Sequence, residues 1–133
     1  MNFKELKRSI DLAVNRKLNS VSHYLDTQHD KRLVGVPLGK YVPTQHREDL
    51  GATASQSSPY LPLQTMLGNE VFDENGVFAD IGCGKVRALA YMAAEYGYKG
   101  RLRGIELNEE VAAIASSWAE NYPNVEIICG NAF

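Results

Sequence analysis

The feature that most constrains the fold of this 133-residue chain is a glycine turn that follows a short apolar run. Residues 77–81 read Val-Phe-Ala-Asp-Ile, and Gly82, Cys83 and Gly84 come next. Such a run is typical of a strand buried within a parallel sheet. Glycines between a strand and a helix allow a sharp bend and a close approach of the backbone to a ligand. A parallel strand needs a crossover to its neighbour, so we expect an α/β fold from this point onward.

The segments after this turn alternate between helix and strand patterns. Apolar periodicity predicts helices over residues 86–97 and 109–121, with Asn108 as the N-cap of the second helix. Apolar runs predict two further strands over residues 101–106 and 125–129. The order βαβαβ implies parallel strands that are joined by right-handed crossovers. We therefore expect an α/β fold with a partial, Rossmann-like parallel sheet of about three strands.

The N-terminal segment has apolar residues at spacings of three and four, which predicts an amphipathic helix over residues 3–25. We expect this helix to pack on the domain that follows, and a contact between subunits is the alternative. Glycines and prolines over residues 26–58 indicate a long connection, which leads into a short helix over residues 61–67. We thus divide the chain into an N-terminal helix with its connection, residues 1–58, and a partial ligand-binding domain, residues 59–133.

Charge and composition exclude several classes of protein. The net charge is −2, which argues against a strongly basic nucleic-acid-binding protein. The N-terminal part is nevertheless basic. We interpret this charge as a solvated basic helix, and a surface that binds nucleic acid or another anionic partner is the alternative. The longest apolar runs are far shorter than the roughly 20 residues that span a bilayer, so no membrane segment is expected.

The cysteines and histidines indicate neither a disulfide framework nor a metal site. Cys83 and Cys129 do not form a CxxC pair, and we interpret them as reduced thiols of a cytoplasmic protein. His23, His29 and His46 have no metal-like spacing with each other or with either cysteine. We therefore expect no metal.

The acids around the glycine turn indicate the kind of ligand. Arg87 stands where the nicotinamide fingerprint needs a third small residue, which argues against a diphosphate held over the turn. Asp80, two residues before Gly82, can accept hydrogen bonds from an ammonium group. Glu106 ends the second predicted strand, where a carboxylate can accept from both hydroxyls of a ribose. A ligand with a ribose and an amino-acid end but no diphosphate is required, and S-adenosylmethionine fits that description.

Three motifs then carry a resemblance to a known family. Asp80, Gly82 and Gly84 match the pattern acid-x-Gly-x-Gly-x-Gly that opens the cofactor half of class I S-adenosylmethionine-dependent methyltransferases. Gly104-Ile105-Glu106-Leu107 resembles their second motif, and Gly130-Asn131-Ala132 resembles their third. Upstream, Gly35-Val36 and Ser58-Pro59-Tyr60 resemble segments of a bacterial and archaeal subgroup that is related to the histone-lysine methyltransferases without a SET domain.

The resemblance implies a role for each matching residue. The turn from Asp80 to Gly84 should cradle the methionine end of the cofactor, with Asp80 toward the ammonium group. Glu106 should hold the ribose hydroxyls, and Leu107 should pack on the adenine. The implied cofactor-binding set is Tyr60, which closes over the methionine end, with Asp80, Gly82, Cys83, Gly84, Glu106 and Leu107, and with Asn131 and Ala132 at the adenine edge. We expect Cys83 to be a small turn residue rather than a nucleophile, and no catalytic residue is assigned.

The chain also departs from the family pattern. Val86 stands where a third glycine is common, and Asn131 replaces an aspartate. Lys85 and Arg87 follow the turn, and they either face an anionic substrate or are simply exposed. The family sheet continues beyond the third strand, whereas this sequence ends there. In the family strand order, the first strand then lies at an edge that can pair with another chain.

Several functions stay open at this point. The leading one is cofactor binding within a methyltransferase that acts on a protein, an RNA or a small molecule. The alternative is a non-enzymatic module that binds the cofactor or a partner, and a nicotinamide-dependent oxidoreductase fragment is disfavoured by Arg87. The short sheet has three explanations: a part of a longer enzyme, a homodimer that pairs through the sheet edge, or a cofactor-binding remnant.

Overall fold

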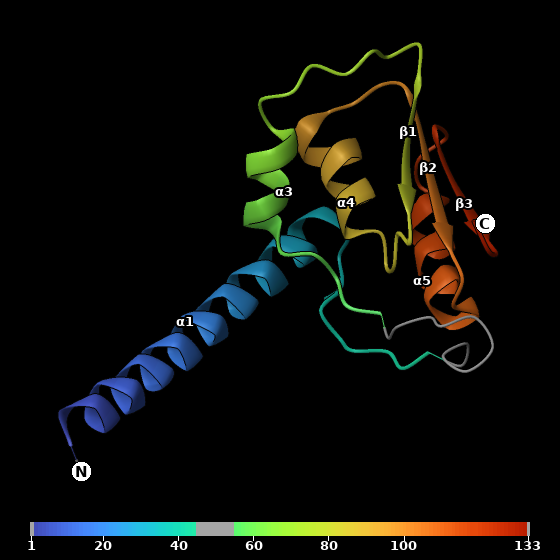
Figure 1. Cartoon of the computed structure of the whole chain (residues 1–133). Helices are drawn as coiled ribbons and strands as arrows, with labels where there is room; N and C mark the ends of the chain where they lie inside the picture. Colours follow the sequence, from blue (N-terminus) through green and yellow to red (C-terminus); the bar gives the residue numbers. More distant parts are fainter. Residues whose placement is uncertain (1, 45–54, 133) are drawn as a thin grey trace.

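The computed structural model describes residues 2–44 and 55–132, and it has a parallel sheet in its C-terminal half (Figure 1). The strands β1 (Val77–Ile81), β2 (Arg101–Glu106) and β3 (Val125–Cys129) lie in the order β1-β2-β3. Val77 pairs with Arg101, and Leu102 pairs with Val125. The predicted strand bounds, the parallel pairing and the edge position of β1 are confirmed within the described residues. The fold is a partial, Rossmann-like α/β fold.

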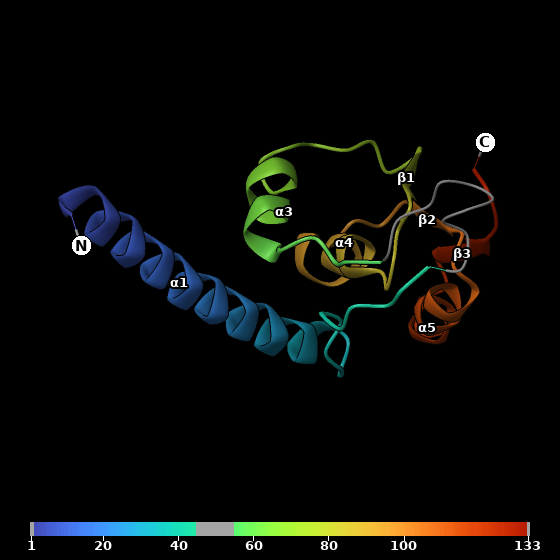
Figure 2. The same cartoon turned by 60° about the horizontal axis from the view of Figure 1, so that its bottom comes forward.

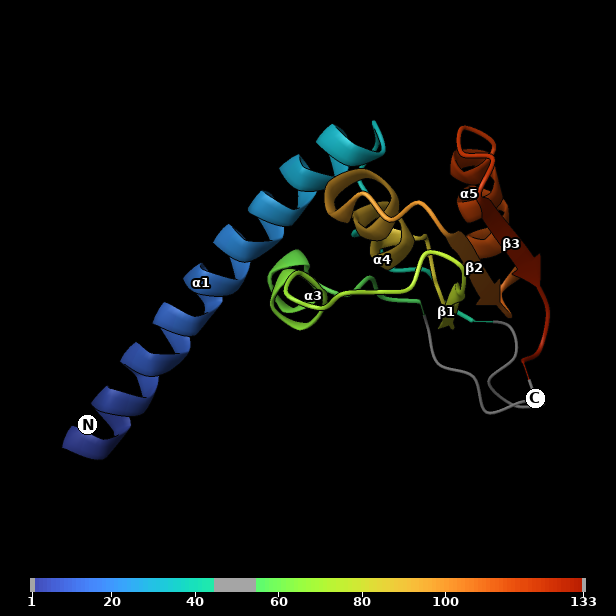
Figure 3. The same ribbon diagram turned by 90° about the horizontal axis from the view of Figure 1, so that it is seen from above.

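Two helical crossovers cover one face of this sheet. In Figure 3 they lie on the same side of the strands: α4 (Arg87–Ala90), which continues as the π-helical segment η1 (Tyr91–Tyr96), and α5 (Glu109–Ala119). The predicted helix over residues 86–97 is present, with two differences in detail. The helix begins only at Arg87, because Val86 has a left-handed backbone, and its second half has π geometry. The predicted N-cap is confirmed, since the Asn108 side chain accepts hydrogen bonds from the amides of Glu110 and Val111.

The hydrophobic core lies between the sheet and these crossovers. Leu89, Met92, Leu102 and Trp118 are buried there, with Phe78 packed against them. The other face of the sheet is largely bare within the described residues, where Val77, Ile81 and Ile128 are exposed. The sheet therefore has one covered face and one open face.

The N-terminal helix is longer than predicted and packs differently. Helix α1 (Phe3–Leu33) begins with a capping box between Asn2 and Glu5, and it extends from the body as an arm (Figure 2). The expectation that its apolar stripe packs on the following domain was wrong, because every side chain of the stripe is exposed. The end of α1 enters the body. His23 lies next to Gly39, and the last two turns, which had been assigned to the connection, contain the fully buried Asp30.

The rest of the predicted connection is tied to the body where the structure describes it. Leu38 and Val42 are buried, and Val42 forms an antiparallel bridge with Ser55. The short helix α3 (Tyr60–Leu67) follows with Pro59 as its N-cap, as the prediction for residues 61–67 anticipated within one residue. Neither α1 nor any other helix in the described ranges is long and apolar enough to cross a membrane.

Candidate functional site

The glycine turn forms the floor of the candidate site. Three alternate positions of the turn have left-handed φ angles, +76° at Gly82, +55° at Gly84 and +78° at Val86. The backbone amides of Gly82 and Cys83 donate to the carbonyl of Ile105, at 2.8 and 3.1 Å, and hold the turn against β2. A Cβ atom added at Gly82 would meet nothing within 4 Å, so the turn is open on its outer side.

Val86 occupies the place of the motif's third glycine and also keeps a glycine-like backbone. A positive φ is a genuine outlier for a β-branched residue. The Val86 side chain is fully buried in the core cluster, which stabilises the conformation that its backbone disfavours. The turn therefore has a left-handed residue at all three glycine positions of the motif, although the third is a valine.

Glu106 connects the turn to the start of α5. Its Oε2 accepts a hydrogen bond from the amide of Gly84 at 2.8 Å, and its Oε1 accepts one from the amide of Asn108 at 3.0 Å. An ionised carboxylate has about four acceptor positions. These two bonds use about half of them, so Glu106 can still accept hydrogen bonds from two hydroxyl groups of a ligand.

Asp80 is a second carboxylate beside the same turn. Burial of the half-buried side chain raises the pKa of Asp80, and the charge of Glu106 raises it further. Two neighbouring carboxylates disfavour phosphate groups and favour a cation or hydrogen-bond donors. Burial also raises the pKa of Cys83 to about 12, as do the charges of Asp80 and Glu106, so its thiol stays protonated at neutral pH.

The third motif lies beside the end of β2. The amide of Gly130 donates to the carbonyl of Glu106 at 2.9 Å, which brings the chain after β3 to the carboxyl end of the neighbouring strand. Asn131 and Ala132 are exposed there, and Leu107 is half-buried. The structure thus gathers all three motifs at the carboxyl ends of the strands. The adenine contacts assigned to Leu107, Asn131 and Ala132 stay predictions.

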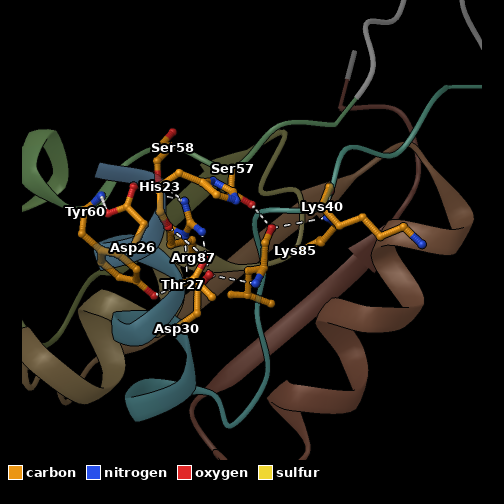
Figure 4. Close-up of polar contacts among 11 residues, drawn as sticks. His23, Asp26, Thr27, Asp30, Lys40, Ser57, Ser58, Tyr60, Lys85 and Arg87 are labelled. Carbon is orange, nitrogen blue, oxygen red and sulfur yellow. Dashed lines mark hydrogen bonds and ion pairs between the residues drawn. The ribbon is translucent and has the colours of Figure 1, made fainter. Parts of the chain in front are cut away.

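Lys85 and Arg87 are both buried, so both expectations for them were wrong. Arg87 donates to Asp30 from Nε at 2.9 Å and from Nη2 at 2.6 Å, in a two-pronged ion pair (Figure 4). The ammonium group of Lys85 donates to the carbonyls of Leu38 and Lys40. Burial lowers the pKa of Lys85, and the charges of Lys40 and Arg87 lower it further. Both cations therefore bind the N-terminal part of the chain instead of facing a substrate.

Tyr60 belongs to the same buried network. Its hydroxyl donates to Oδ1 of Asp30 at 2.7 Å, its ring stacks on His29 at 3.9 Å between centroids, and the Arg87 guanidinium lies 5.1 Å from the ring centroid. Burial raises the pKa of Tyr60, and its hydrogen bond to Asp30 adds to the rise. Tyr60 is buried in this arrangement, and its predicted closure over the methionine end stays a prediction.

Asp30 is the residue of this region that sequence reasoning missed. Its carboxylate also accepts from the amide of Leu38 at 2.8 Å, so it joins α1, the connection, α3 and α4. The sequence offered one signal for Asp30, namely Asp26 four residues earlier. Asp26 also joins this network, because its carboxylate accepts a hydrogen bond from the amide of Tyr60. The spacing of four between Asp26 and Asp30 continues the helical period into residues assigned to the connection.

The connection also borders the site itself. The Asn108 side chain donates to the carbonyl of Pro43 at 3.0 Å, next to the backbone that Glu106 binds. A Cβ atom added at Gly84 would lie 3.4 Å from the Ser55 hydroxyl oxygen. The described ends of the connection thus pass close to the turn and to the start of α5.

A groove lies outside this site. It has a volume of about 480 Å³ and lies between residues 34–38 and α5, and apolar side chains such as those of Val36, Ile114 and Trp118 line most of it. Its lining contains none of the predicted cofactor-binding residues. In the part of the chain that the structure describes, no group of acidic, histidine or cysteine side chains is arranged to hold a metal ion.

Comparisons with known proteins give partial likenesses in structure only. No protein-family model matches the sequence, and no curated protein is significantly similar to it. A protein-L-isoaspartate O-methyltransferase is 26% identical over 62% of this chain and 27% of its own, with a TM-score of 0.47. The YcgJ protein from Bacillus subtilis is 25% identical over 55% of this chain and 31% of its own, with a TM-score of 0.46. The cyclase SpnF is 19% identical over 84% of this chain and 42% of its own, with a TM-score of 0.49. The chain spans less than half the length of each of these proteins.

Proposed function

We propose that this chain binds S-adenosylmethionine at the glycine turn, as the cofactor-binding part of a methyltransferase. One observation carries the proposal: an open, left-handed glycine turn has the two carboxylates of Asp80 and Glu106 beside it. A diphosphate would be repelled by these charges, whereas an ammonium group and ribose hydroxyls are suited to them. The two carboxylates therefore disfavour a nicotinamide dinucleotide independently of Arg87.

The residues present fit the ammonium group and the ribose hydroxyls of this cofactor. Asp80 would accept hydrogen bonds from the ammonium group, and the charge of that group would lower the raised pKa of Asp80. Glu106 would accept from the ribose hydroxyls with the acceptor positions that its two amide partners leave available. The open space above Gly82 leaves room for the methionine end. The proposed adenine contacts are those of Leu107, Asn131 and Ala132.

The bound cofactor would supply an activated methyl group on its sulfonium centre. The residues of this chain would hold and orient that group, and positioning is a large part of catalysis in such transfers. We assign no general base, and the acceptor is proposed only as a protein, an RNA or a small molecule. A non-enzymatic binding module is the alternative, favoured by the open edge of β1 and the bare face of the sheet in the described part of the chain. That edge stays a candidate homodimer contact.

Calorimetric titration of the 133-residue chain with S-adenosylmethionine, and with NAD as the comparison ligand, tests the proposal. We expect one site for the former and no binding of NAD. Asp80→Asn keeps the shape of the side chain but removes its charge, and it should weaken binding on the order of tenfold or more. The matched control is Glu126→Gln, which changes an exposed carboxylate of β3 that pairs with Arg103 away from the turn.

The outcomes separate the competing functions. Binding of NAD alone would support the oxidoreductase hypothesis and contradict the proposal. Binding of neither ligand by a chain with a cooperative unfolding transition would show that the turn is only structural. Equal losses of affinity in Asp80→Asn and in Glu126→Gln would show that the cofactor binds elsewhere. Transfer of a labelled methyl group to an added acceptor would distinguish an enzyme from a binding module.

A further inference from the structure

The outer part of α1 carries an apolar stripe that nothing in the described chain covers. Seven side chains form it, and each is between 46% and 81% exposed: Phe3, Leu6, Ile10, Val14, Leu18, Val21 and Leu25. The helix extends away from the body along this whole length (Figures 1 and 3). Isolated exposed apolar residues are normal, but an aligned row over six turns marks an interaction surface.

The body of the same chain is on the wrong side to cover this stripe. The base of α1 packs on the body through Asp26, His29, Asp30 and Leu33. At about 100° per residue, the centre of that packing face is roughly 120° around the helix axis from the centre of the stripe. A small bend at the base of the arm would not turn the stripe toward the body. The described body therefore leaves the stripe free for a partner from outside it.

The density of the stripe indicates that its partner is a single helix. The intervals are three, four, four, four, three and four residues, so about one apolar side chain faces the partner in each turn. That density is typical of the seam between two helices, whereas a helix that lies on a membrane carries a broader apolar face. Lys7 and Lys17 lie at the two margins of the stripe and limit its width.

The spacing of the stripe is nearly the same in both directions, which points to a second copy of this chain. With a twofold axis at Val14, an antiparallel partner places Phe3 opposite Leu25 and Ile10 opposite Leu18, while Val14 meets its own copy. A twofold contact requires a patch of this kind, because the same surface must complement itself. We propose that the outer part of α1 pairs with the same segment of a second copy, antiparallel and centred on Val14.

The charges select the antiparallel direction over the parallel one. A parallel pair in register would place Lys7 and Lys17 beside their own copies at the margin of the seam, and facing like charges are destabilising. In the antiparallel pair centred on Val14, the rise of about 1.5 Å per residue separates the two copies of Lys17 by about 9 Å along the axis, and those of Lys7 by about 21 Å. In that register Asp11 is about 9 Å along the axis from its own copy, and no other acid of the partner lies level with it.

The mass of the wild-type chain and of two variants in sedimentation equilibrium tests this pairing. We expect a concentration-dependent dimer for the wild type. Val14→Lys places two like charges at the twofold axis and should give a monomer. Asn19→Lys adds the same charge on the side of α1 away from the stripe, and it should leave the dimer intact. Helix content from circular dichroism checks that both variants stay folded.

Two results would overturn the proposal. One is a wild-type monomer at every concentration tested. If that monomer sediments with phosphatidylserine vesicles, and the Val14→Lys variant sediments with them more strongly, the stripe contacts an anionic membrane instead, because added positive charge strengthens such a contact. The other result is a dimer that survives Val14→Lys, which would place the contact elsewhere, for example at the β1 edge.

Cysteine cross-linking tests the direction of the two helices. In a Cys129→Ser background, which removes the exposed native thiol, we expect Val14→Cys to form a disulfide between two copies under mild oxidation. Leu18→Cys should not, because its two copies would be about 12 Å apart along the axis, whereas a disulfide needs Cα atoms within about 7 Å. Equal cross-linking of both variants would indicate a parallel pair and would contradict the proposed register.

Discussion

The left-handed backbone of Val86 gives the sharpest test of how the turn is held. The residue has a φ of +78° and a side chain that is fully buried. Val111 in α5 is equally buried but has an ordinary helical backbone, so it serves as the matched control. The comparison uses alanine and glycine variants at both positions. At each position we compare the free energy of unfolding of the glycine variant with that of the alanine variant. Both variants lose most of the buried valine side chain, so this larger loss cancels in the comparison.

The expected magnitudes follow from the two backbones. At Val111, the change from alanine to glycine should cost about 1 kcal/mol of helix propensity, and the lost methyl group should cost about 0.8 kcal/mol. At Val86, the change from alanine to glycine carries similar penalties. It also relieves the left-handed strain of about 1–2 kcal/mol that a side chain causes there, and this relief offsets the penalties. The alanine-to-glycine step should therefore cost about 2 kcal/mol at Val111 and close to zero at Val86.

Urea unfolding followed by the fluorescence of Trp118, the single tryptophan of the chain, measures all four variants. The buried ring of Trp118 lies in the core and reports on the folded state. A similar alanine-to-glycine step at both positions would refute the reasoning. It would mean that Val86 does not hold a strained, left-handed conformation in solution, and that the turn does not keep the form of a three-glycine motif.

Three further predictions use the same unfolding measurement. Asp30→Ala should lower the free energy of unfolding by about 3–5 kcal/mol, because it leaves the guanidinium of Arg87 buried without its carboxylate. The double variant Asp30→Ala with Arg87→Met should recover part of that loss, and additive losses of the two single variants would contradict the coupling. Asn108→Ala should cost about 1 kcal/mol through loss of the N-cap of α5, and an unchanged stability would argue against the cap. Burial raises the folded-state pKa of Asp80 above 3.8, the value of the unfolded chain, so ionisation of Asp80 lowers the stability of the folded state. This loss of stability is absent below pH 3.8 and complete above the folded-state pKa. The wild type should therefore lose stability relative to Asp80→Asn as pH rises through this window, and parallel pH profiles would contradict the shift.

The elements that the sequence predicts well are those that depend on local patterns. The strand bounds follow from apolar runs, and the start of α5 follows from Asn108, whose side chain caps the helix within three residues of itself. The three motifs meet at the carboxyl end of the sheet because each of them follows one of three consecutive parallel strands. That arrangement can be expected from topology alone.

The parts that the sequence does not predict depend on contacts between distant residues. Arg87 and Asp30 are 57 positions apart, and nothing local in either segment indicates that a buried ion pair joins them. The exposure of the α1 stripe has a similar reason. Periodicity shows that a stripe exists, but the side of the helix that meets the body is decided by polar residues at its base. The π geometry after α4 also lacked a local signal.

The central claim concerns where S-adenosylmethionine binds, and backbone amide shifts in the nuclear magnetic resonance spectrum of the isotope-labelled chain test it most directly. We predict that the added cofactor shifts the amide signals of Gly82, Gly84 and Leu107, with Gly130 beside them, while signals of α1 stay unchanged. NAD at the same concentration should leave all of these signals in place. Absence of any shift at the glycine turn, or shifts confined to the groove beside α5, would contradict the account.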